Sequence, residues 1–491
     1  MRPVSANRLK RILTPDPQRL ITKAYLPSDA DPVGEQTRIE RVMRRVIALT
    51  PAEVSATLEE LRRRFSGRHG PLDEVFSRGF LAVAPSVRED DELTDEMKLV
   101  IGAYFTHEYS IEGAALTNPS IVPAPDQSGV PGGSLRVLVS LRAVGEGHIS
   151  SIEFRDGVIG PGGQVDVAEP ARAVTGTRKW PSFDKRVFAV KLEEIGADAD
   201  LIGNTLGRLD DSFAMTDLER ALFDLASEEA PSDATLNVIH VMRWLASSNY
   251  LLSFPSETDV SQRVLFPNGP TESQGMEDAR FVRFVEDDGA IVYYGTYTAY
   301  DGLRILPQLI VTTDFREFRI ATLNGPAAQN KGMALFPRRV SGRYAALSRL
   351  DAENNLLMFS DNVRSWQTAD TIQIPSRPWE LMQIGNAGSP IETEAGWLVV
   401  THGVGPMRQY ALGAILLDLD DPRRVIGHLR DPLLEPDETE RDGYVPNVVY
   451  SCGSVVHDGH LVIAYGASDT YTRFATVPLD ALLTELTRTR S

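Results

Sequence analysis

The chain is poor in cysteine: its 491 residues contain only Cys452, so no disulfide can form within it. It is also short of basic residues, because 50 Lys and Arg stand against 68 Asp and Glu and give a formal net charge of −18. This balance disfavours nucleic acid or an anionic membrane surface as a partner. No apolar run is long enough to cross a membrane, and the N-terminus lacks the apolar core of a signal peptide. We therefore expect a cytoplasmic protein.

Clusters of His, Cys, Asp and Glu at metal-ligand spacing are missing as well, so we predict no metal and no cofactor. Cys452 is interpreted as a small buried apolar residue rather than a nucleophile.

Residues 1–117 are predicted to form a helical region. The apolar residues of segment 35–49 recur at helical spacing, and Thr50, Pro51 and Glu53 together form the start signal of a second helix. Thr94 is a candidate cap for a third helix over 94–116.

From residue 118 onward the pattern changes to short strands, each preceded by a turn that ends in glycine. Gly289, Gly342, Gly396 and Gly459 follow one another at 53, 54 and 63 residues, and a further copy follows Gly133. Five copies at the length of a propeller blade predict an all-β five-bladed β-propeller over residues 118–491. The N-terminal α-helical extension precedes it, and a helical insertion at about 205–250 interrupts it.

The segment 275–280 is the candidate centre of the chemistry. Glu277 and Asp278 form a carboxylate pair, Arg280 follows, and the hairpin 281–297 comes next around a turn at 286–289. A structural Asp–Arg pair is the alternative interpretation. Because the inner strands of a propeller converge on one channel, the repeat register predicts that residues of several blades face one cavity. These residues are Arg142, Asp278, Lys331, Arg349, Gln383, His402 and Asp469.

Several short motifs, taken in order over residues 118–483, resemble glycoside hydrolase family 130, the β-mannoside phosphorylases and β-mannosidases. These motifs are residues 140–143 with 149–152, 275–280, 297–300, 330–332 with 335–337, 347–349, 384–385 with 390–393, 396–398 with 402–404, 446–449 and 465–470. Ala279 stands where the family motif usually has proline. The family fold, a five-bladed propeller, agrees with the repeat count, whereas the long helical N-terminus looks like an extension for homo-oligomer contacts.

The resemblance implies an inverting reaction on a β-linked mannoside. Asp278 matches the family's proton donor, whose proton is relayed through a sugar hydroxyl. Glu277 and Arg280 would position this acid. Asp469 would bind the mannose, and the resemblance also assigns Asn118 and Arg142 to the sugar site.

The resemblance leaves two nucleophiles open. Inorganic phosphate needs a cationic site and no general base, whereas water needs a second carboxylate on the opposite face of the sugar. Lys331 stands where an arginine is usual, and Gln383 where a lysine is usual. The other residues that match the phosphate site are Arg349, His402 and Tyr410, with His402 as a third cation if it is protonated.

We therefore expect an inverting β-mannoside phosphorylase that cleaves a β-linked manno-oligosaccharide with phosphate as co-substrate and gives mannose 1-phosphate. One alternative is an inverting β-1,2-mannosidase that uses water, with Glu380 or Glu392 as the candidate base. A sugar-binding propeller without turnover, and a mannosyltransferase that runs the same reaction in reverse, complete the alternatives.

Overall fold

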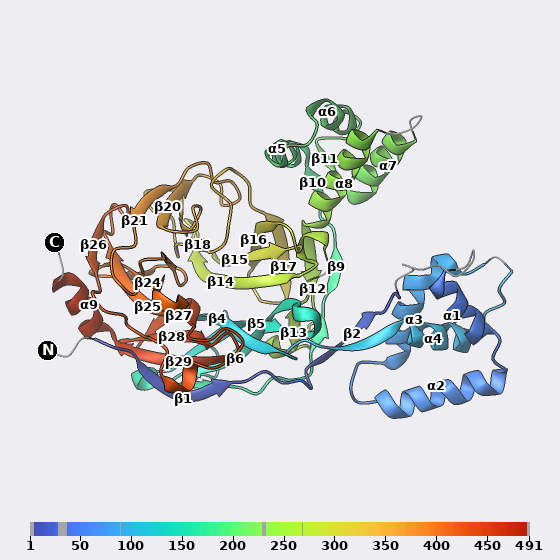
Figure 1. Cartoon of the computed structure of the whole chain (residues 1–491), viewed down its shortest axis with the longest axis horizontal. Helices are drawn as coiled ribbons and strands as arrows, with labels where there is room; N and C mark the ends of the chain where they lie inside the picture. The colour runs from blue at the N-terminus through green and yellow to red at the C-terminus, as the bar shows by residue number, and fades with distance from the viewer. Residues whose placement is uncertain (1–3, 28–36, 89, 228–231, 268, 489–491) are drawn as a thin grey trace. The chain divides into compact units, whose positions relative to one another are not determined.

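The computed structural model describes residues 4–27, 37–88, 90–227, 232–267 and 269–488. The chain divides into two compact units, one formed by Asp16–Gly113 and the other by Met1–Pro15 together with Ala114–Ser491. We call the first the helical unit and the second the β unit, after the elements that dominate each (Figure 1). None of the helices in the described ranges is long and apolar enough to cross a membrane.

Within its described residues the β unit contains five antiparallel meanders. The first is β4 (Ala115–Pro123), β5 (Leu135–Val144) and β6 (Ser150–Ile159), and the second is β14 (Gly275–Val285), β15 (Ile291–Tyr300), β16 (Ile305–Thr312) and β17 (Glu317–Thr322). The third is β18 (Ala334–Leu335), β19 (Tyr344–Ser348), β20 (Asn355–Ser360) and β21 (Asp370–Gln373), and the fourth is β22 (Gln383–Asn386), β24 (Gly396–Val404), β25 (Tyr410–Leu417) and β26 (Val425–His428). The fifth is β27 (Val449–His457), β28 (His460–Ala467) and β29 (Tyr471–Pro478). Each strand that was predicted after a glycine turn is confirmed, and each is the second strand of its meander.

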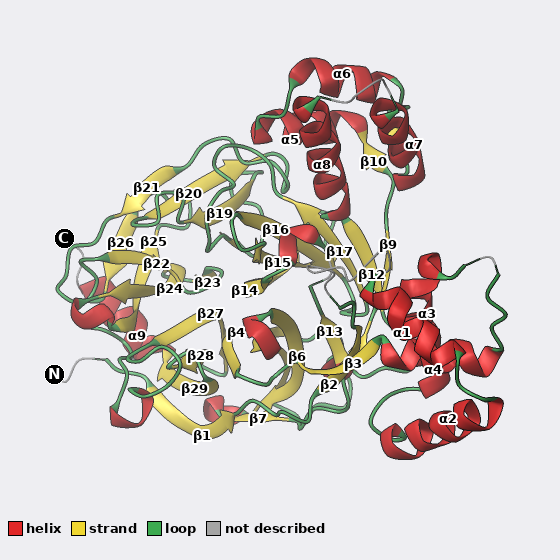
Figure 2. Ribbon diagram, turned by 45° about the vertical axis from the view of Figure 1, so that its right-hand side comes forward, coloured by secondary structure: helices red, strands yellow, loops and turns green. Residues whose placement is uncertain are grey.

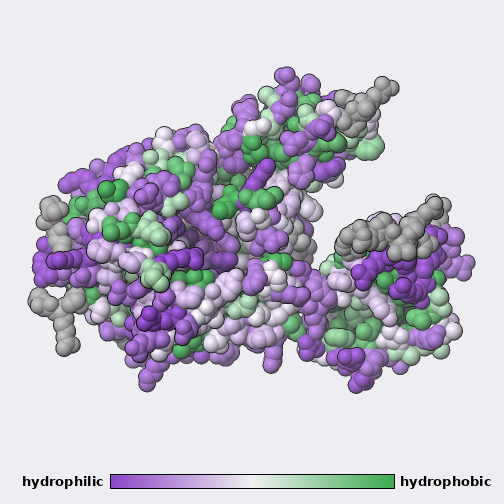
Figure 3. All heavy atoms as spheres, viewed as in Figure 1, coloured by the Kyte–Doolittle hydropathy of each residue, from purple (hydrophilic) through white to green (hydrophobic). Residues whose placement is uncertain are grey.

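Shorter strands extend these sheets. They are β7 (Val165–Val167), β8 (Val174–Thr175), β9 (Thr177–Lys179), β12 (Tyr250–Ser253), β13 (Arg263–Leu265) and β23 (Ile391–Thr393). A parallel pairing of Gly275 with Ser150 joins the first two meanders into one sheet. Hydrophilic side chains cover most of the face of the β unit that Figure 3 draws, so the large apolar residues lie mainly inside, between the meanders.

The N-terminal residues differ from the expected helical region. β1 (Asn7–Leu13) pairs antiparallel with β29 and is the fourth strand of the fifth meander. The first and last parts of the chain therefore share one sheet, because backbone hydrogen bonds to β29 override the local sequence preference of this basic segment. Residues 1–3 and 28–36 of the expected helical region lie outside the described residues.

The helical unit contains α1 (Arg38–Ile47), α2 (Pro51–Phe65), α3 (Leu72–Val83) and α4 (Asp95–Tyr104), with the paired strands β2 (Leu20–Ala24) and β3 (Thr106–Ser110). The capping signal at Thr50 is confirmed, because its hydroxyl accepts a hydrogen bond from the Glu53 N–H and its own N–H donates to the Glu53 carboxylate. Thr94 caps α4 as predicted. The predicted continuation of that helix to residue 116 is wrong, because the segment after Phe105 pairs with β2 instead.

The helical insertion is longer than predicted. It contains α5 (Lys185–Ile195), α6 (Ala199–Gly207), α7 (Met215–Ala226), α8 (Asp233–Ser247) and the short pair β10 (Phe183–Asp184) and β11 (Ser212–Phe213). Residues 228–231 of the predicted insertion lie outside the described residues. Figure 2 shows these helices together at one edge of the β unit. Lys191 of α5 donates to the Leu323 carbonyl at 2.9 Å, and Glu194 accepts from the Gly325 N–H at 2.7 Å, so α5 attaches the insertion to the second meander.

Candidate active site

Three first strands of meanders, β4, β14 and β27, interrupt their ladders at matching places. The register shifts between Thr117 and Ser120 in β4, between Glu277 and Arg280 in β14, and in β27 just after Tyr450. β4 lies against both β14 and β27. Bulges of this kind bend a strand and redirect its side chains, and they are frequent next to active sites.

Two of these bulges hold residues in the left-handed region, Asn118 at φ 48° and Asp278 at φ 55°. This conformation costs on the order of 1–2 kcal/mol for a residue with a Cβ, although Asn and Asp adopt it more readily than most. The backbone strain is therefore located at the two residues whose side chains meet: the Asn118 Nδ2 donates to Asp278 Oδ1 at 2.7 Å.

A cavity of about 340 Å³ opens where these strands converge. Its lining contains most of the residues that the sequence predicted to face one site. The lining residues are Asn118, Arg142, Asp278, Lys331, Arg349, Gln383, Arg408, Tyr410, Val445, Val448, Tyr450 and Asp469. Among the described residues there is no group of three or more His, Cys, Asp and Glu that could hold a metal ion.

One side of the cavity, which we call the acid wall, consists of Asn118, Arg142, Glu277, Asp278 and Lys331. Arg142 donates to Glu277 at 2.7 Å and lies 3.4 Å from Asp278, and Lys331 donates to the other oxygen of Glu277 at 2.6 Å. Both cations of this wall, Arg142 and Lys331, are thus already paired with Glu277 in the free protein.

Arg280 stabilises the bulge from behind. Its guanidinium donates to the backbone carbonyl of Asp278 at 3.1 Å and to the Tyr450 hydroxyl at 2.7 Å. Burial raises the pKa of Tyr450 to about 12, so this phenol remains protonated. The contact joins β14 to β27 and fixes the backbone that carries Asp278.

The acid wall determines the charge state of Asp278. Burial opposes its ionisation, but the charges of Arg142 and Arg280 outweigh burial and hold the pKa of Asp278 below its usual value. Lys331 and the hydrogen bond from Asn118 act in the same direction. For Asp469 the balance is opposite, because burial and the nearby charge of Asp278 raise its pKa despite Arg142.

The other side of the cavity, which we call the anion wall, comes from the third and fourth meanders. It consists of Arg349, Gln383, His402, Arg408 and Tyr410. All but His402 line the cavity directly. The wall contains hydrogen-bonding atoms without a partner, because the buried Arg349 Nε and His402 Nε2 have none. Its arrangement depends on Gly385, where a Cβ would lie 2.4 Å from Arg349 Cδ and 2.5 Å from His402 Cε1.

His402 does not supply the third positive charge considered for the phosphate site. Burial and the neighbouring charges of Arg349 and Arg280 hold the pKa of His402 well below its usual value, so the ring is neutral. Its Nδ1 lies 3.0 Å from the Asn386 carbonyl and must carry the proton, which leaves Nε2 as an acceptor.

The two candidate bases for hydrolysis do not line the cavity. Glu380 is fully buried, and one of its oxygens accepts from Arg377 at 2.8 Å and from Ser376. Glu392 pairs with Arg338 at 2.5 Å on the surface. Among the described residues, Asp278 and Asp469 are the carboxylates of the cavity lining.

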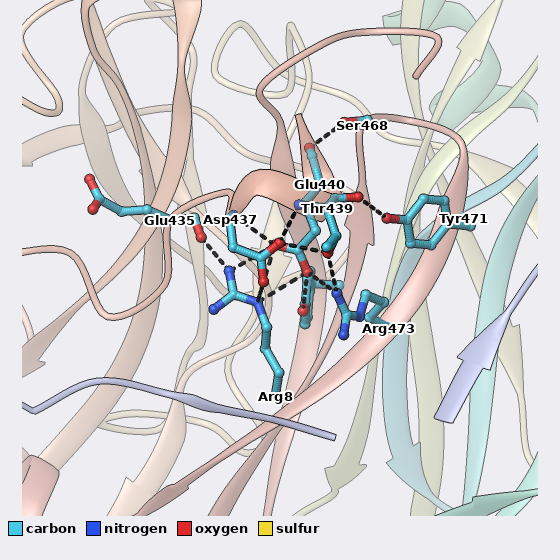
Figure 4. A network of polar contacts seen from close by, with 9 residues as sticks. Arg8, Glu435, Asp437, Thr439, Glu440, Ser468, Tyr471 and Arg473 are labelled. Atoms are coloured by element: carbon cyan, nitrogen blue, oxygen red, sulfur yellow. Dashed lines mark hydrogen bonds and ion pairs between the residues drawn. The ribbon is translucent and has the colours of Figure 1, made fainter. Parts of the chain in front are cut away.

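The residue before Asp469, Ser468, contacts a polar network around the buried Glu440 (Figure 4). Arg8 of β1 and Arg473 of β29 reach Glu440 at 2.7 and 2.8 Å, and the Tyr465 hydroxyl donates to it at 2.7 Å. The hydroxyl of Ser468 donates to the Glu440 carbonyl, directly before Asp469. The N-terminal strand therefore helps to fix the loop next to a cavity-lining carboxylate.

Comparisons with known proteins identify the family of the chain. A family model described as β-1,4-mannooligosaccharide phosphorylase, that of glycoside hydrolase family 130, matches residues 253–488. A 1,2-β-oligomannan phosphorylase from Thermoanaerobacter sp. (strain X514) is 36% identical over 206 residues, which cover 40% of this chain and 67% of the relative. A β-1,2-mannobiose phosphorylase from the same organism is 35% identical over 220 residues, covering 44% of this chain and 70% of the relative. The chain belongs to glycoside hydrolase family 130.

Among solved structures, the β-1,2-mannobiose phosphorylase from Listeria innocua aligns with 77% of this chain and 93% of its own, at 20% identity and a TM-score of 0.45. The segment matched by the family 130 model contains Asp278, the anion wall and Asp469. Asn118 and Arg142 of the acid wall precede that segment.

Two cavity residues of chemical interest, Tyr450 and Arg408, were not predicted from the sequence. Tyr450 comes directly after the motif 446–449, so the continuation of that motif into β27 was the available signal. Arg408 lies two residues before the predicted Tyr410, in a loop that matched no motif. The interpretation of Cys452 as a buried residue is confirmed, and burial raises the pKa of its thiol to about 12.

Proposed function

We propose that this protein is an inverting β-mannoside phosphorylase that transfers a mannosyl group from a β-linked manno-oligosaccharide to inorganic phosphate and releases mannose 1-phosphate. The observation that carries the proposal is the division of one cavity into a charge-balanced acid wall and an anion wall whose arginines have no carboxylate partner among the described residues. The names of the relatives support it, since both Thermoanaerobacter proteins act on β-1,2-linked mannosides. We therefore take β-1,2-mannobiose as the first substrate to test.

In this reaction Asp278 is the general acid. A phosphate oxygen attacks the anomeric carbon from the face opposite the leaving group, the glycosidic C–O bond breaks, and the leaving oxygen takes the proton that Asp278 supplies through a sugar hydroxyl. The low pKa of Asp278 means that it is ionised in the free protein, so it must take up a proton when phosphate and sugar bind before it can act as the acid. Phosphate in the cavity adds negative charge and displaces water, and both effects raise the pKa of a carboxyl group.

Phosphate is favoured over water because it needs no base. An inverting hydrolase requires a second carboxylate about 6.5–9.5 Å from the acid to activate water. Glu380 and Glu392 are engaged elsewhere, and Asp469 lies beside the acid wall, where Arg142 attracts it. Arg349 lines the cavity and instead suits the negative charge of phosphate. His402 packs with Arg349 against Gly385 and has an acceptor at Nε2, although it does not line the cavity itself.

We further infer that the five meanders are the blades of a five-bladed propeller and that the cavity lies at one end of its central channel. In support, each meander contributes one predicted repeat, and β4, β14 and β27 contact one another as first strands of their meanders. Pairing of β1 with β29 then closes the propeller with the N-terminal segment. The expected homo-oligomer through the helical unit stays a prediction, which sedimentation of the full chain and of a variant without residues 16–113 would test.

The activity is tested by product analysis with β-1,2- and β-1,4-mannobiose, each with and without phosphate. We expect mannose 1-phosphate only when phosphate is present, with the Asp278→Asn protein as the inactive control. Free mannose formed at a rate independent of phosphate would instead identify a hydrolase. Binding of mannobiose without any turnover would identify a sugar-binding protein.

A further inference from the structure

The cavity holds one arginine that the sequence did not predict, Arg408. It lies in the loop between β24 and β25, closed by a hydrogen bond from the Gly405 N–H to the Gln409 carbonyl at 2.9 Å. Met407 and Arg408 both have left-handed backbones, at φ 58° and 56°. Two consecutive strained residues in a five-residue loop indicate a fixed conformation rather than a freely moving one.

The loop has a defined support. A Cβ on Gly405 would lie 3.0–3.2 Å from backbone atoms of Trp379, so the loop rests directly on that residue. Met407 and Arg408 are both exposed, and Arg408 also lines the cavity.

The sheet register places Arg408 beside Gln383, the uncharged residue that stands where a lysine is usual. Gln383 pairs with Val404, and Val404 pairs with Tyr410, so Gln383 and Tyr410 flank the same end of β24. Arg408 belongs to the loop that leaves this end. Gln383, Arg408 and Tyr410 therefore surround one corner of the cavity.

Without Arg408, this corner of the cavity would lack a positive charge. On the acid wall, Arg142 and Lys331 are already paired with Glu277. On the anion wall, the ring of His402 is neutral. Among the described residues, the Arg349 side chain donates only to the Ala352 carbonyl, at 3.4 Å. Among the described residues no carboxylate pairs with Arg408. An oxyanion with up to two negative charges would find two uncommitted cations here, Arg349 and Arg408.

We propose that Arg408 is the second cation of the anion site and determines the affinity for phosphate, binding the oxygens of inorganic phosphate or of the phosphoryl group of a sugar 1-phosphate. This inference deepens the proposed function and rests on it. The guanidinium of Arg408 would provide the charge that Gln383, at the same corner of the cavity, does not provide.

The first test compares the wild type with Arg408→Gln and with the control Arg220→Gln, which removes an exposed charge on α7 away from the cavity. We expect Arg408→Gln to raise the KM for phosphate on the order of 10–100-fold, as for a lost charge-assisted hydrogen bond, with a much smaller change in the KM for mannobiose. Arg220→Gln should match the wild type. An unchanged KM for phosphate, or a rise in the KM for mannobiose alone, would overturn the proposal.

The second test replaces Gln383 with lysine in the Arg408→Gln protein. In Arg408→Gln/Gln383→Lys the new ammonium lies at the same corner of the cavity, so we expect much of the affinity for phosphate to return. Failure of this variant to improve on Arg408→Gln, although correctly folded by circular dichroism, would contradict a role for Arg408 through charge at this corner.

Calorimetry with inorganic phosphate alone separates this inference from the proposed function. Weaker phosphate binding by Arg408→Gln than by the wild type supports the inference even if the wild type turns out to hydrolyse mannobiose with water. Equal phosphate binding by the two proteins would reject it even if the wild type is a phosphorylase.

Discussion

The two walls of the cavity differ in how far their polar groups are satisfied before any ligand arrives. On the acid wall, Glu277 binds two cations and Asp278 accepts from Asn118. On the anion wall, Arg349 Nε and His402 Nε2 are buried without a partner. Buried polar groups without partners are costly, so they mark the place where a ligand is expected to complete the hydrogen bonding.

This difference indicates two kinds of preorganisation. The acid wall holds a strained aspartate in one geometry through contacts within the protein, whereas the anion wall holds cations apart from carboxylates until an anion binds. Replacements on the acid wall should therefore reduce turnover, and replacements on the anion wall should reduce the affinity for phosphate.

The largest effect is expected for Asp278→Asn. The amide keeps the shape of the side chain and can still accept from Asn118, but it cannot donate a carboxyl proton. We expect kcat to fall by about 10²–10⁴-fold, the usual contribution of a general acid. The measurement is the release of mannose 1-phosphate at saturating phosphate. Substantial turnover by an Asn variant with unchanged melting temperature would remove Asp278 as the acid.

A smaller effect, confined to the anion wall, is expected for Arg349→Gln. Loss of this cation should raise the KM for phosphate about 10–100-fold and leave kcat nearly unchanged. The matched control is Arg343→Gln, since Arg343 pairs with Asp361 on the surface of the same meander. If kcat fell and the KM for phosphate stayed constant, the contrast between the walls would be wrong.

Gly385→Ala tests the geometry of the anion wall without changing its charge. The new methyl group would displace Arg349 and His402, so we expect kcat/KM for phosphate to fall about tenfold. Gly203→Ala in α6 serves as the control, because a Cβ there has no neighbour within 4 Å. Equal kinetics for both variants would show that the close approach at Gly385 is not needed.

The smallest effect concerns the pH dependence of stability at His402. Its folded-state pKa is lowered, so below about pH 6.5 the unfolded chain takes up a proton at this residue that the folded protein excludes. Stability is therefore lost as the pH falls below that value, by up to about 1.4 kcal/mol per pH unit. We expect the melting temperature to drop less between pH 7.5 and 5.5 in His402→Gln than in the wild type. Equal drops would mean that His402 titrates normally.

Part of the fold could be predicted because its signals are local. Glycine turns followed by apolar runs marked the second strand of every meander, and the Thr50 capping box marked the start of α2. The prediction failed at β1, which pairs with β29, and at β2 and β3, which pair with each other. The strands that pair with them are distant in the sequence, and whether a segment forms a strand depends strongly on the strand beside it.

For the site, the sequence by itself determined the residue types and the family: Asp278 with its neighbours, Arg349, His402 and Asp469 all stand in recognisable motifs. Only the tertiary structure decided their charge states and partners. The neutral ring of His402 results from burial near two arginines. The low pKa of Asp278 results from Arg142 on β5 and Arg280 on its own strand, with Lys331 acting in the same direction. The place of Arg408 likewise depends on the register of β22, β24 and β25. Electrostatic interactions depend on distance and solvent exposure, and both are fixed only when the strands come together.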